Sequence, residues 1–412
     1  MKKSKPGSRS KKQRKIPFID YPLQGTKVDL PLETVFSFSA DQRNKYVKRL
    51  LNSLGREIKH DRMALKARIS FAREMRDLRK LLYAPVDKYL YTDQITRRRN
   101  VLGKGSPGST HTYWSRTQMW KMATKGGDLR QLILGKTPNL VTSLERLFDP
   151  NFTGKASLRT VRHTAVQNAL SYMQFDKGVG TAFPPFHAKF FADKYLPKQG
   201  DGIIVDPCAG WGGRLLGSLC VPRSGHVRYY GTDPEKRNKP AYEGLTRRIN
   251  VWLKREIPGK RTGRIFYQPF EDWMVSKSAK KLRGMVDLVF TSPPYFSAEN
   301  YNTDNRKQSA NRYTSYDEWR ELFYRRLVQG AYDLLKPGGH FVLNIANVAE
   351  AKHLERDART LAKEVGFERA AFFKLAMSIN PRILSAGPPK HSVTVDGSMF
   401  KYEPVFCFMK PL

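Results

Sequence analysis

The sequence predicts an α/β protein built on a doubly wound sheet, preceded by a mainly helical, basic domain. Two strand-and-turn units indicate the sheet: the mainly apolar run 286–290 ends at a turn with two prolines, and the run 202–206 ends in a glycine-rich turn. Short apolar runs are typical of strands buried on both faces. Apolar residues at three-to-four spacing between 41 and 82 indicate helices instead. We expect three parts: a disordered basic arm and connector (1–30), a helical domain (31–160) and an α/β domain (161–412).

The charge of the chain points to a polyanionic partner. The 412 residues are 40% hydrophobic, which fits a folded globular protein, and they carry a formal charge of +37. A surface this basic favours nucleic acid. No apolar run of about 18 residues and no secretory signal pattern occurs, so neither a membrane span nor export is predicted. The 3 cysteines have no metal-ligand spacing and indicate a reducing compartment, so we expect a cytoplasmic protein without metal.

The positive charge is concentrated in the N-terminal part. Residues 1–160 hold 35 Lys and Arg against 13 Asp and Glu, which leaves 39 and 24 for the other residues. Residues 1–15 contain eight basic residues and no acidic one, which is typical of an arm that contacts phosphates. The helical pattern over 41–82 has mostly positive residues on its other faces. We therefore expect residues 31–160 to engage DNA, and the aromatic residues near 111–120 could stack on bases or form a core.

A glycine-rich loop follows the strand 202–206. Its sequence is Asp206-Pro207-Cys208-Ala209-Gly210-Trp211-Gly212-Gly213-Arg214, and a helix is expected over 214–219. Glycines let the backbone approach a ligand closely, but the spacing differs from the dinucleotide pattern. An acid beside the loop suits a ligand with positive groups. We interpret Cys208 as a packing residue.

A rigid turn with acceptor groups and aromatic side chains follows the strand 286–290. Ser292, Pro293, Pro294, Tyr295 and Phe296 stand where the strand ends. Proline fixes the backbone and removes an N–H donor, so the carbonyls nearby are held as rigid acceptors. Ligands of open α/β sheets bind at the carboxyl ends of the strands. This combination suits a flat base with an amino group, which needs a stacking surface and acceptors at its edge.

These two motifs together resemble the S-adenosylmethionine-dependent DNA methyltransferases that modify exocyclic amines. The loop 206–213 is similar to their S-adenosyl-L-methionine loop, and 292–295 is similar to their catalytic motif. The resemblance covers about residues 175–412. It implies a class I methyltransferase-like sheet of seven strands with an antiparallel last strand, and it implies that Ser292 and the Pro293 carbonyl accept the two N–H bonds of the amine while Tyr295 stacks on the base.

The resemblance also assigns residues to the cofactor. Asp206, Pro207, Ala209, Gly210, Gly212 and Gly213 form the loop, and Asp233 at the end of the strand 227–231 would bind the ribose hydroxyls. Phe270 would pack on the adenine, and Asp272 or Glu271 would accept from its amino group. Phe183 and Pro184, in a turn before a helix over 187–195, would close over the methionine end.

The loop 297–315 is the candidate substrate-binding segment. It is long and polar, and its amide, arginine and tyrosine side chains could read base edges or hold the target strand. The candidates are Phe296, Asn300, Tyr301, Arg306 and Arg312. A helix over 316–335, a strand over 340–345, a helix over 351–365 and a closing pair over 370–375 and 404–409 complete the expected sheet.

Several functions remain open at this point. Ser in the first position of the catalytic motif favours cytosine N4 methylation over adenine N6 methylation. An RNA base or protein-glutamine methyltransferase shares the Pro-Pro-Tyr logic but usually has Asn there. An inactive, architectural DNA-binding protein is the alternative of another class. Flipping of the base out of the duplex is expected, with neither metal nor covalent intermediate. A restriction-modification or phage context in a bacterial cytoplasm is expected, and the target sequence and the oligomeric state remain open.

Overall fold

The computed structural model describes part of the chain. The described residues are 38–43, 45, 46, 48, 71–103, 123, 124, 127, 128, 182–298, 301, 305–377 and 391–412. The chain divides into two compact units, one of residues 1–62 and 132–174 and the other of residues 63–131 and 175–412. In the first unit, Phe38 and Tyr46 pack edge to face with ring centroids 5.5 Å apart. The second unit contains the sheet and the candidate site.

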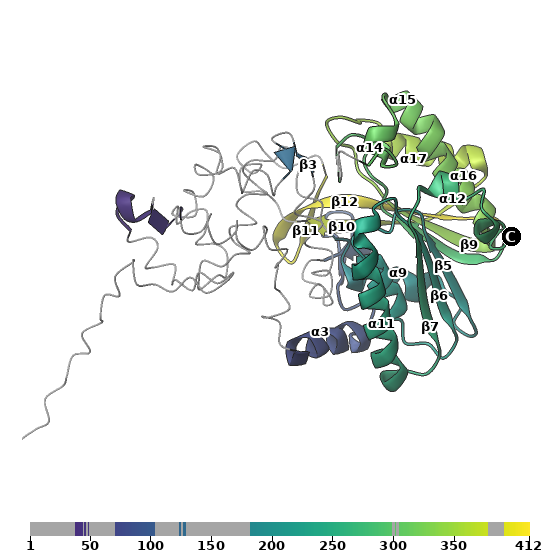
Figure 1. The fold of residues 1–412 in the computed structure, drawn as a ribbon, viewed down its shortest axis with the longest axis horizontal. Helices are drawn as coiled ribbons and strands as arrows, with labels where there is room; N and C mark the ends of the chain where they lie inside the picture. Colours follow the sequence, from purple (N-terminus) through teal and green to yellow (C-terminus); the bar gives the residue numbers. More distant parts are fainter. Residues whose placement is uncertain are drawn as a thin grey trace, which may run out of the picture. The chain divides into compact units, whose positions relative to one another are not determined.

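One ten-stranded sheet organises the second unit (Figure 1). Its strands are β1 (Leu90–Thr92), β2 (Arg99–Leu102), β5 (Gly202–Asp206), β6 (Val227–Thr232), β7 (Arg261–Phe266), β8 (Val286–Thr291), β9 (Leu335–Asn344), β10 (Glu368–Met377), β11 (Ser392–Val395) and β12 (Ser398–Met409). Their order is β1-β2-β10-β12-β9-β8-β5-β6-β7, with β11 paired to β12. A separate hairpin is formed by β3 (Ala123–Thr124) and β4 (Gly127–Asp128).

The strand directions confirm the predicted fold class. Neighbouring strands among β7, β6, β5, β8 and β9 are parallel, and β12 is antiparallel to β9 and to β10. The seven strands from β7 to β10 form the expected class I methyltransferase-like sheet with an antiparallel last strand. The strands β1, β2 and β11 extend it beyond the prediction.

Helices cover both faces of this sheet (Figure 1). The described helices of this unit are α3 (Phe71–Tyr83), α9 (Pro185–Tyr195), α10 (Gly213–Leu219), α11 (Lys239–Glu256), α12 (Phe270–Trp273), α13 (Lys277–Lys280), α14 (Ser309–Arg312), α15 (Tyr316–Trp319), α16 (Arg325–Leu334) and α17 (Leu354–Val365), with the 3-10 turn η5 (Lys236–Asn238) and the π-helical turn η6 (Arg320–Tyr324). Side chains alternate along each strand, so Ile204 of β5 faces the core under α9, α10 and α11. Ile203 and Val205 face the core under α16 and α17.

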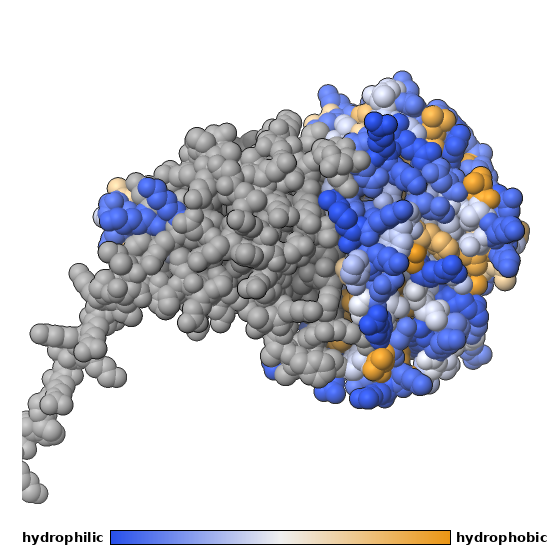
Figure 2. All heavy atoms as spheres, in the orientation of Figure 1, coloured by the Kyte–Doolittle hydropathy of each residue, from blue (hydrophilic) through white to orange (hydrophobic). Residues whose placement is uncertain are grey.

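The coloured part of the face drawn in Figure 2 is mostly hydrophilic, with small separate apolar areas. The large apolar side chains are mainly inside, and those of the central strand β8, from Val286 to Phe290, are buried. Within the described part of the chain, none of the helices combines the length and the apolar character that crossing a bilayer requires.

The segment from α3 to β2 is built into the core of the second unit. Leu78, Leu81 and Leu82 of α3 pack in the same core as α9 and α10, and β2 pairs in parallel with β10. Lys189 of α9 is buried, and its Nζ donates to the carbonyls of Leu81, Leu82 and Ala84 at 2.9, 2.6 and 2.9 Å. This lysine satisfies carbonyls at the C-terminal end of α3, which helix geometry leaves without partners.

A second hydrogen bond connects α9 to the segment from α3 to β2. The Nε2 of His187 donates to the Gly103 carbonyl at 2.7 Å, and burial lowers the pKa of this imidazole to about 4. Residues 71–103 therefore belong to the structure of the sheet, although the sequence placed them in the helical part 31–160. The arm and connector 1–30, the aromatic cluster near 111–120 and most of 31–160 lie outside the described residues, and the boundary at residue 160 stays a prediction.

Candidate active site

The glycine-rich loop has backbone conformations and close contacts that require glycine. Gly210 and Gly212 have φ angles of +63° and +86°, in the left-handed region that favours glycine. Gly213 is required for a different reason: a Cβ there would lie 2.0 Å from the Phe183 carbonyl oxygen. The loop is thus held directly against the segment that precedes α9, which contains Phe183 and Pro184.

Asp206 holds this loop in place through buried hydrogen bonds. Its carboxylate is fully buried and accepts from the Arg214 Nε at 2.7 Å and from the Tyr229 hydroxyl at 2.5 Å. It also accepts from the Cys208 N–H at 3.1 Å. Burial opposes the charge of Arg214, but the neighbouring Asp206 raises the pKa of the guanidinium overall. Asp206 therefore shapes the loop and lies outside the two cavities described below, whereas the sequence suggested that its charge would face the ligand.

Asp233 lies at the end of β6 and connects to the same loop. Its carboxylate accepts from the backbone N–H groups of Gly210 and Glu235, both at 2.8 Å. Burial raises the pKa of Asp233 to about 7, and repulsion from Glu235 and Asp206 acts in the same direction, while the two N–H bonds oppose it. The Tyr242 hydroxyl donates to the Gly210 carbonyl, so the loop is held from both sides.

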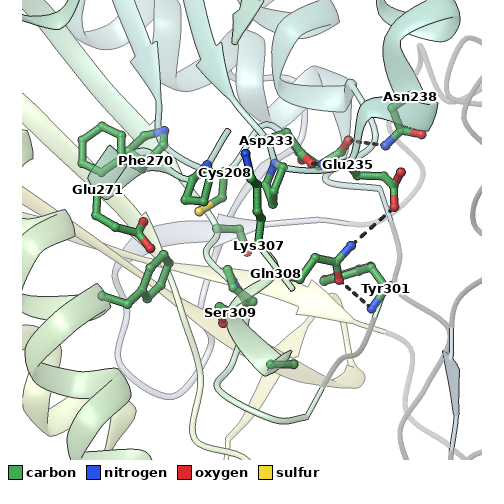
Figure 3. A pocket seen from close by; sticks show the side chains of 18 of the residues that line it. Cys208, Asp233, Glu235, Asn238, Phe270, Glu271, Tyr301, Lys307, Gln308 and Ser309 are labelled. Atoms are coloured by element: carbon green, nitrogen blue, oxygen red, sulfur yellow. Dashed lines mark hydrogen bonds between the residues drawn. The ribbon is translucent and has the colours of Figure 1, made fainter. Parts of the chain in front are cut away.

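A first cavity lies beside this loop, and Figure 3 shows it closely. At one end lie Phe270 and Glu271; at the other lie Asp233, Glu235 and Asn238. Its lining also includes Pro207, Cys208, Gly210, Trp211, Pro269, Ser292, Pro294, Tyr301, Lys307, Gln308 and Ser309. Burial raises the pKa of Cys208 well above its ordinary value, which agrees with the packing role expected for this thiol.

Two acceptor atoms of this cavity have no hydrogen-bond partner. Among the described residues, the buried Asn238 Oδ1 and Glu271 Oε2 atoms are unpaired. The other Glu271 oxygen accepts from the Tyr313 hydroxyl at 2.7 Å, and burial raises the pKa of this carboxyl. Buried polar atoms are normally paired, so these two indicate where donor groups of a ligand would bind.

The structure distinguishes the two acids that the sequence offered beside Phe270. Glu271 lines the first cavity, and Asp272 does not. Asp272 instead forms a bidentate pair with Arg312, with N–O distances of 3.0 and 2.9 Å. Consecutive residues of a helix point about 100° apart, so only one of the two can face the cavity.

The turn 292–296 is the candidate catalytic turn, and it lies against the glycine-rich loop. The Thr291 hydroxyl at the end of β8 accepts from the Cys208 N–H at 3.1 Å, which joins the two segments directly. This contact follows from the parallel pairing of β5 with β8, which brings both carboxyl ends to one edge of the sheet.

A second cavity lies on the other side of the turn. Ser292, Pro293 and Tyr295 line it, together with Gly103, Ala182, Phe183, Pro184, His187, Ala209, Gly210, Trp211, Gly213, Arg214, Tyr301, Asn344, Leu375, Ala376, Met377 and Glu403. Gly210, Trp211, Ser292 and Tyr301 line both cavities, so the two cavities adjoin at the meeting point of the loops.

The candidate substrate residues have different surroundings. Tyr301 lines both cavities, and its ring contacts Trp211 edge to face at 5.8 Å. Phe296 has a φ of +54° and packs against Tyr316 and Trp319, outside both cavities. Arg306 is exposed and lines neither cavity, and Arg312 pairs with the acids beside Phe270. Asn300 lies outside the described residues.

Several lining residues were missed by the sequence reasoning. Asn238 lies in η5, shortly after Asp233, whereas Asn344 and Glu403 come from β9 and β12, which reach the site only through the order of the strands. For Asn344 and Glu403, the one signal in the sequence was a polar residue directly beside an apolar strand segment. Within the described ranges, no group of three or more His, Cys, Asp or Glu side chains is placed to hold a metal ion.

Comparison with known proteins agrees with this site. Residues 286–383 match the family model N6_N4_Mtase, described as DNA methylase. The matched segment includes the catalytic turn and Asn344. It supports an amino-methyltransferase family, leaves cytosine N4 and adenine N6 unresolved, and indicates S-adenosyl-L-methionine as the cofactor. No curated protein matches the sequence.

Solved structures give distant likenesses. A SAM-dependent O-methyltransferase from Thermotoga maritima has 14% identity and a TM-score of 0.33, over 57% of this chain and 68% of that chain. A SAM-dependent methyltransferase from Methanosarcina mazei has 14% identity and a TM-score of 0.32, over 57% and 100%. A putative RNA methyltransferase from Pyrococcus horikoshii has 11% identity and a TM-score of 0.31, over 55% and 83%. The fold assignment above rests on strand order and direction instead.

Proposed function

We propose that this protein is an S-adenosylmethionine-dependent methyltransferase that modifies an exocyclic amine of a DNA base, with cytosine N4 as the preferred target. One observation carries the proposal. The glycine-rich loop and the catalytic turn are joined through Cys208 and Thr291, and the two cavities that they line share Gly210 and Ser292. A donor in one cavity and an acceptor in the other would meet at this point.

The first cavity suits the nucleoside part of the cofactor. Asp233 and the unpaired Asn238 Oδ1 and Glu271 Oε2 are acceptors, and ribose hydroxyls and an adenine amine are donors. Phe270 offers an apolar surface for a flat ring. When bound, S-adenosylmethionine supplies a methyl group on a positively charged sulfur. The shared residues Gly210 and Trp211 would lie beside this part of the cofactor.

The second cavity suits a flipped base. The lone pair of an exocyclic amine is delocalised into the ring, so the amine is a weak nucleophile. The Ser292 hydroxyl and the Pro293 carbonyl would accept its two N–H bonds and localise the lone pair, while Tyr295 would stack on the ring. Positioning and fixed dipoles would supply most of the rate enhancement.

The charge of the chain supports DNA as the partner. Its formal charge of +37 would be attracted to phosphates, and the N-terminal part carries more than half of it. Ser292 in the first motif position favours cytosine N4. Adenine N6 is the second candidate, because both bases carry an amine next to a ring nitrogen. The two adjoining cavities favour an active enzyme over an architectural protein with an inactive methyltransferase fold.

The proposal is tested by incubating the full chain with labelled S-adenosylmethionine and unmethylated duplex DNA, followed by mass spectrometry of the nucleosides. N4-methylcytosine is expected. N6-methyladenine would select the second candidate. Methylation of RNA or of protein glutamine with no methylated DNA would contradict the proposal, as would DNA binding without any cofactor binding.

A further inference from the structure

A carboxyl group of the closing strand enters the second cavity. Glu403 of β12 lines this cavity, and its Oε2 accepts from the Tyr295 hydroxyl at 3.4 Å. On the sheet, Glu403 is the register partner of Leu375 in β10. Asn344, whose Nδ2 donates to the Pro404 carbonyl at 3.1 Å, lies beside it. A carboxyl group is therefore held next to the aromatic residue that would stack on the base.

The surroundings of Glu403 favour its neutral form. The side chains that β10 contributes to the cavity are Leu375, Ala376 and Met377, all apolar. Burial raises the pKa of Glu403, and Lys401 on the same strand and hydrogen bonds from Asn344 and Tyr295 only partly oppose this shift. Among the described residues, the other titratable or charged groups that line the cavity are the hydroxyls of Tyr295 and Tyr301, His187, whose pKa is lowered by burial, and Arg214, which is paired with Asp206.

A neutral carboxyl has one O–H donor, which a carboxylate lacks. Cytosine and adenine both have an unprotonated ring nitrogen next to the exocyclic amine, N3 in cytosine and N1 in adenine. Thymine and guanine carry an N–H at the corresponding position. A hydrogen-bond donor beside the ring therefore distinguishes cytosine and adenine, which accept at this nitrogen, from thymine and guanine, which carry an N–H there.

We propose that Glu403 recognises the edge of the flipped base, by donating a hydrogen bond from its carboxyl group to the ring nitrogen next to the target amine. Ser292 and Pro293 read the amine, Tyr295 reads the face of the ring, and Glu403 reads the neighbouring ring atom. This makes Glu403 a specificity-determining residue from the strand farthest along the chain. The inference rests on the proposed function, since it assumes that a base occupies the second cavity.

The test compares two bases and four proteins. The wild-type chain first identifies the methylated site in DNA. Oligonucleotide duplexes then carry either the normal target base or its deaza analogue, 3-deazacytosine or 1-deazaadenine, which lacks the ring nitrogen. The proteins are the wild type, Glu403→Leu, Glu403→Gln and the control Glu368→Gln, which changes an exposed acid at the start of β10.

The wild type and the control are expected to lose on the order of tenfold in kcat/KM on the deaza base. Glu403→Leu is expected to show this loss already on the normal base and to treat both bases alike. Glu403→Gln keeps a donor, so it should stay near the wild-type rate. Wild-type activity should fall as the pH rises through the pKa of Glu403, and Glu403→Gln should not show this fall.

Three results would overturn the inference. Glu403→Leu could discriminate against the deaza base as strongly as the wild type. Glu403→Gln could be as slow as Glu403→Leu, which would make the carboxyl a proton acceptor instead. Should Glu403→Leu fail to fold, a wild-type rate equal on both bases would also exclude the contact. Absence of any methylated base from the wild-type reaction is a separate result, which would reject the proposed function itself.

Discussion

A substitution at Gly213 tests most directly whether the glycine-rich loop packs against the backbone of Phe183. A Cβ at this position would lie 2.0 Å from the Phe183 carbonyl oxygen and 3.1 Å from the Phe183 carbonyl carbon. Both atoms are backbone, so the contact cannot be relieved by rotating a side chain. In Gly213→Ala, either the start of α10 or the segment before α9 must shift by more than an ångström.

The expected cost is about 1–3 kcal/mol, the range for forcing extra carbon into a packed interior. For a domain of this size, that corresponds to a fall in Tm of roughly 2–4 °C for each kcal/mol. Gly210→Ala is the matched control. A Cβ there would have its nearest contact at 3.7 Å, but φ is +63°, so its cost is the backbone term of about 1–2 kcal/mol.

The two variants should therefore differ in what they disturb. Gly213→Ala displaces Phe183, which lines the second cavity, and Gly210→Ala leaves that segment in place. Thermal unfolding would measure the stability, and calorimetric titration with S-adenosylmethionine would measure the affinity. A Gly213→Ala protein with wild-type Tm, beside a Gly210→Ala protein with a lowered Tm, would refute the close packing of α10 on the segment before α9.

Three further predictions concern single side chains. Tyr295→Ala should abolish methyl transfer with little change in cofactor affinity, while Tyr295→Phe should keep transfer because the ring remains; turnover by the Ala variant equal to wild type would place the base elsewhere. Burial raises the pKa of Asp233 to about 7 in the folded protein, whereas the pKa is about 4 in the unfolded chain. The contribution of Asp233 to the free energy of unfolding should therefore fall as the pH rises from about 4 to 7 and then stay constant. Asp233→Asn should remove this part of the pH dependence of the unfolding free energy, measured by denaturant titration at each pH. Lys189→Met should lower the free energy of unfolding by about 1–3 kcal/mol, since three carbonyls lose their donor; a variant as stable as the wild type would show that water can replace the ammonium.

The local motifs could be predicted from the sequence because they are contiguous. The strand, loop and helix around Gly210 lie within residues 202–219 and the strand and turn around Ser292 within residues 286–296, and their residue types have direct backbone consequences. The opposition of the two loops followed from the rule that ligands bind at the carboxyl ends of parallel strands. The structure confirms the predicted fold class on the strand directions.

The other features of the site could not be predicted, because they depend on the direction in which a helical turn points its side chains or on pairing between distant strands. Glu271 and Asp272 are adjacent, and only the direction of the first turn of α12 decides which one faces the cavity. Phe296 has a positive φ and its ring packs against Tyr316. No local sequence pattern predicted this backbone conformation. Glu403 reaches the site because β12 lies beside β9, a pairing between residues far apart along the chain.

The ties from α9 to the preceding segment have a consequence for how this protein can be divided. Cutting the chain near residue 160 would remove the acceptors of Lys189 and the carbonyl that holds His187, and would strip away two strands at the edge of the sheet. The apolar side chains of α9 and α10 that Leu78, Leu81 and Leu82 cover would then be exposed to water. A fragment that begins at residue 161 should therefore be insoluble or unfolded, and a chimaera with a different N-terminal part would have to keep residues 71–103 together with the sheet.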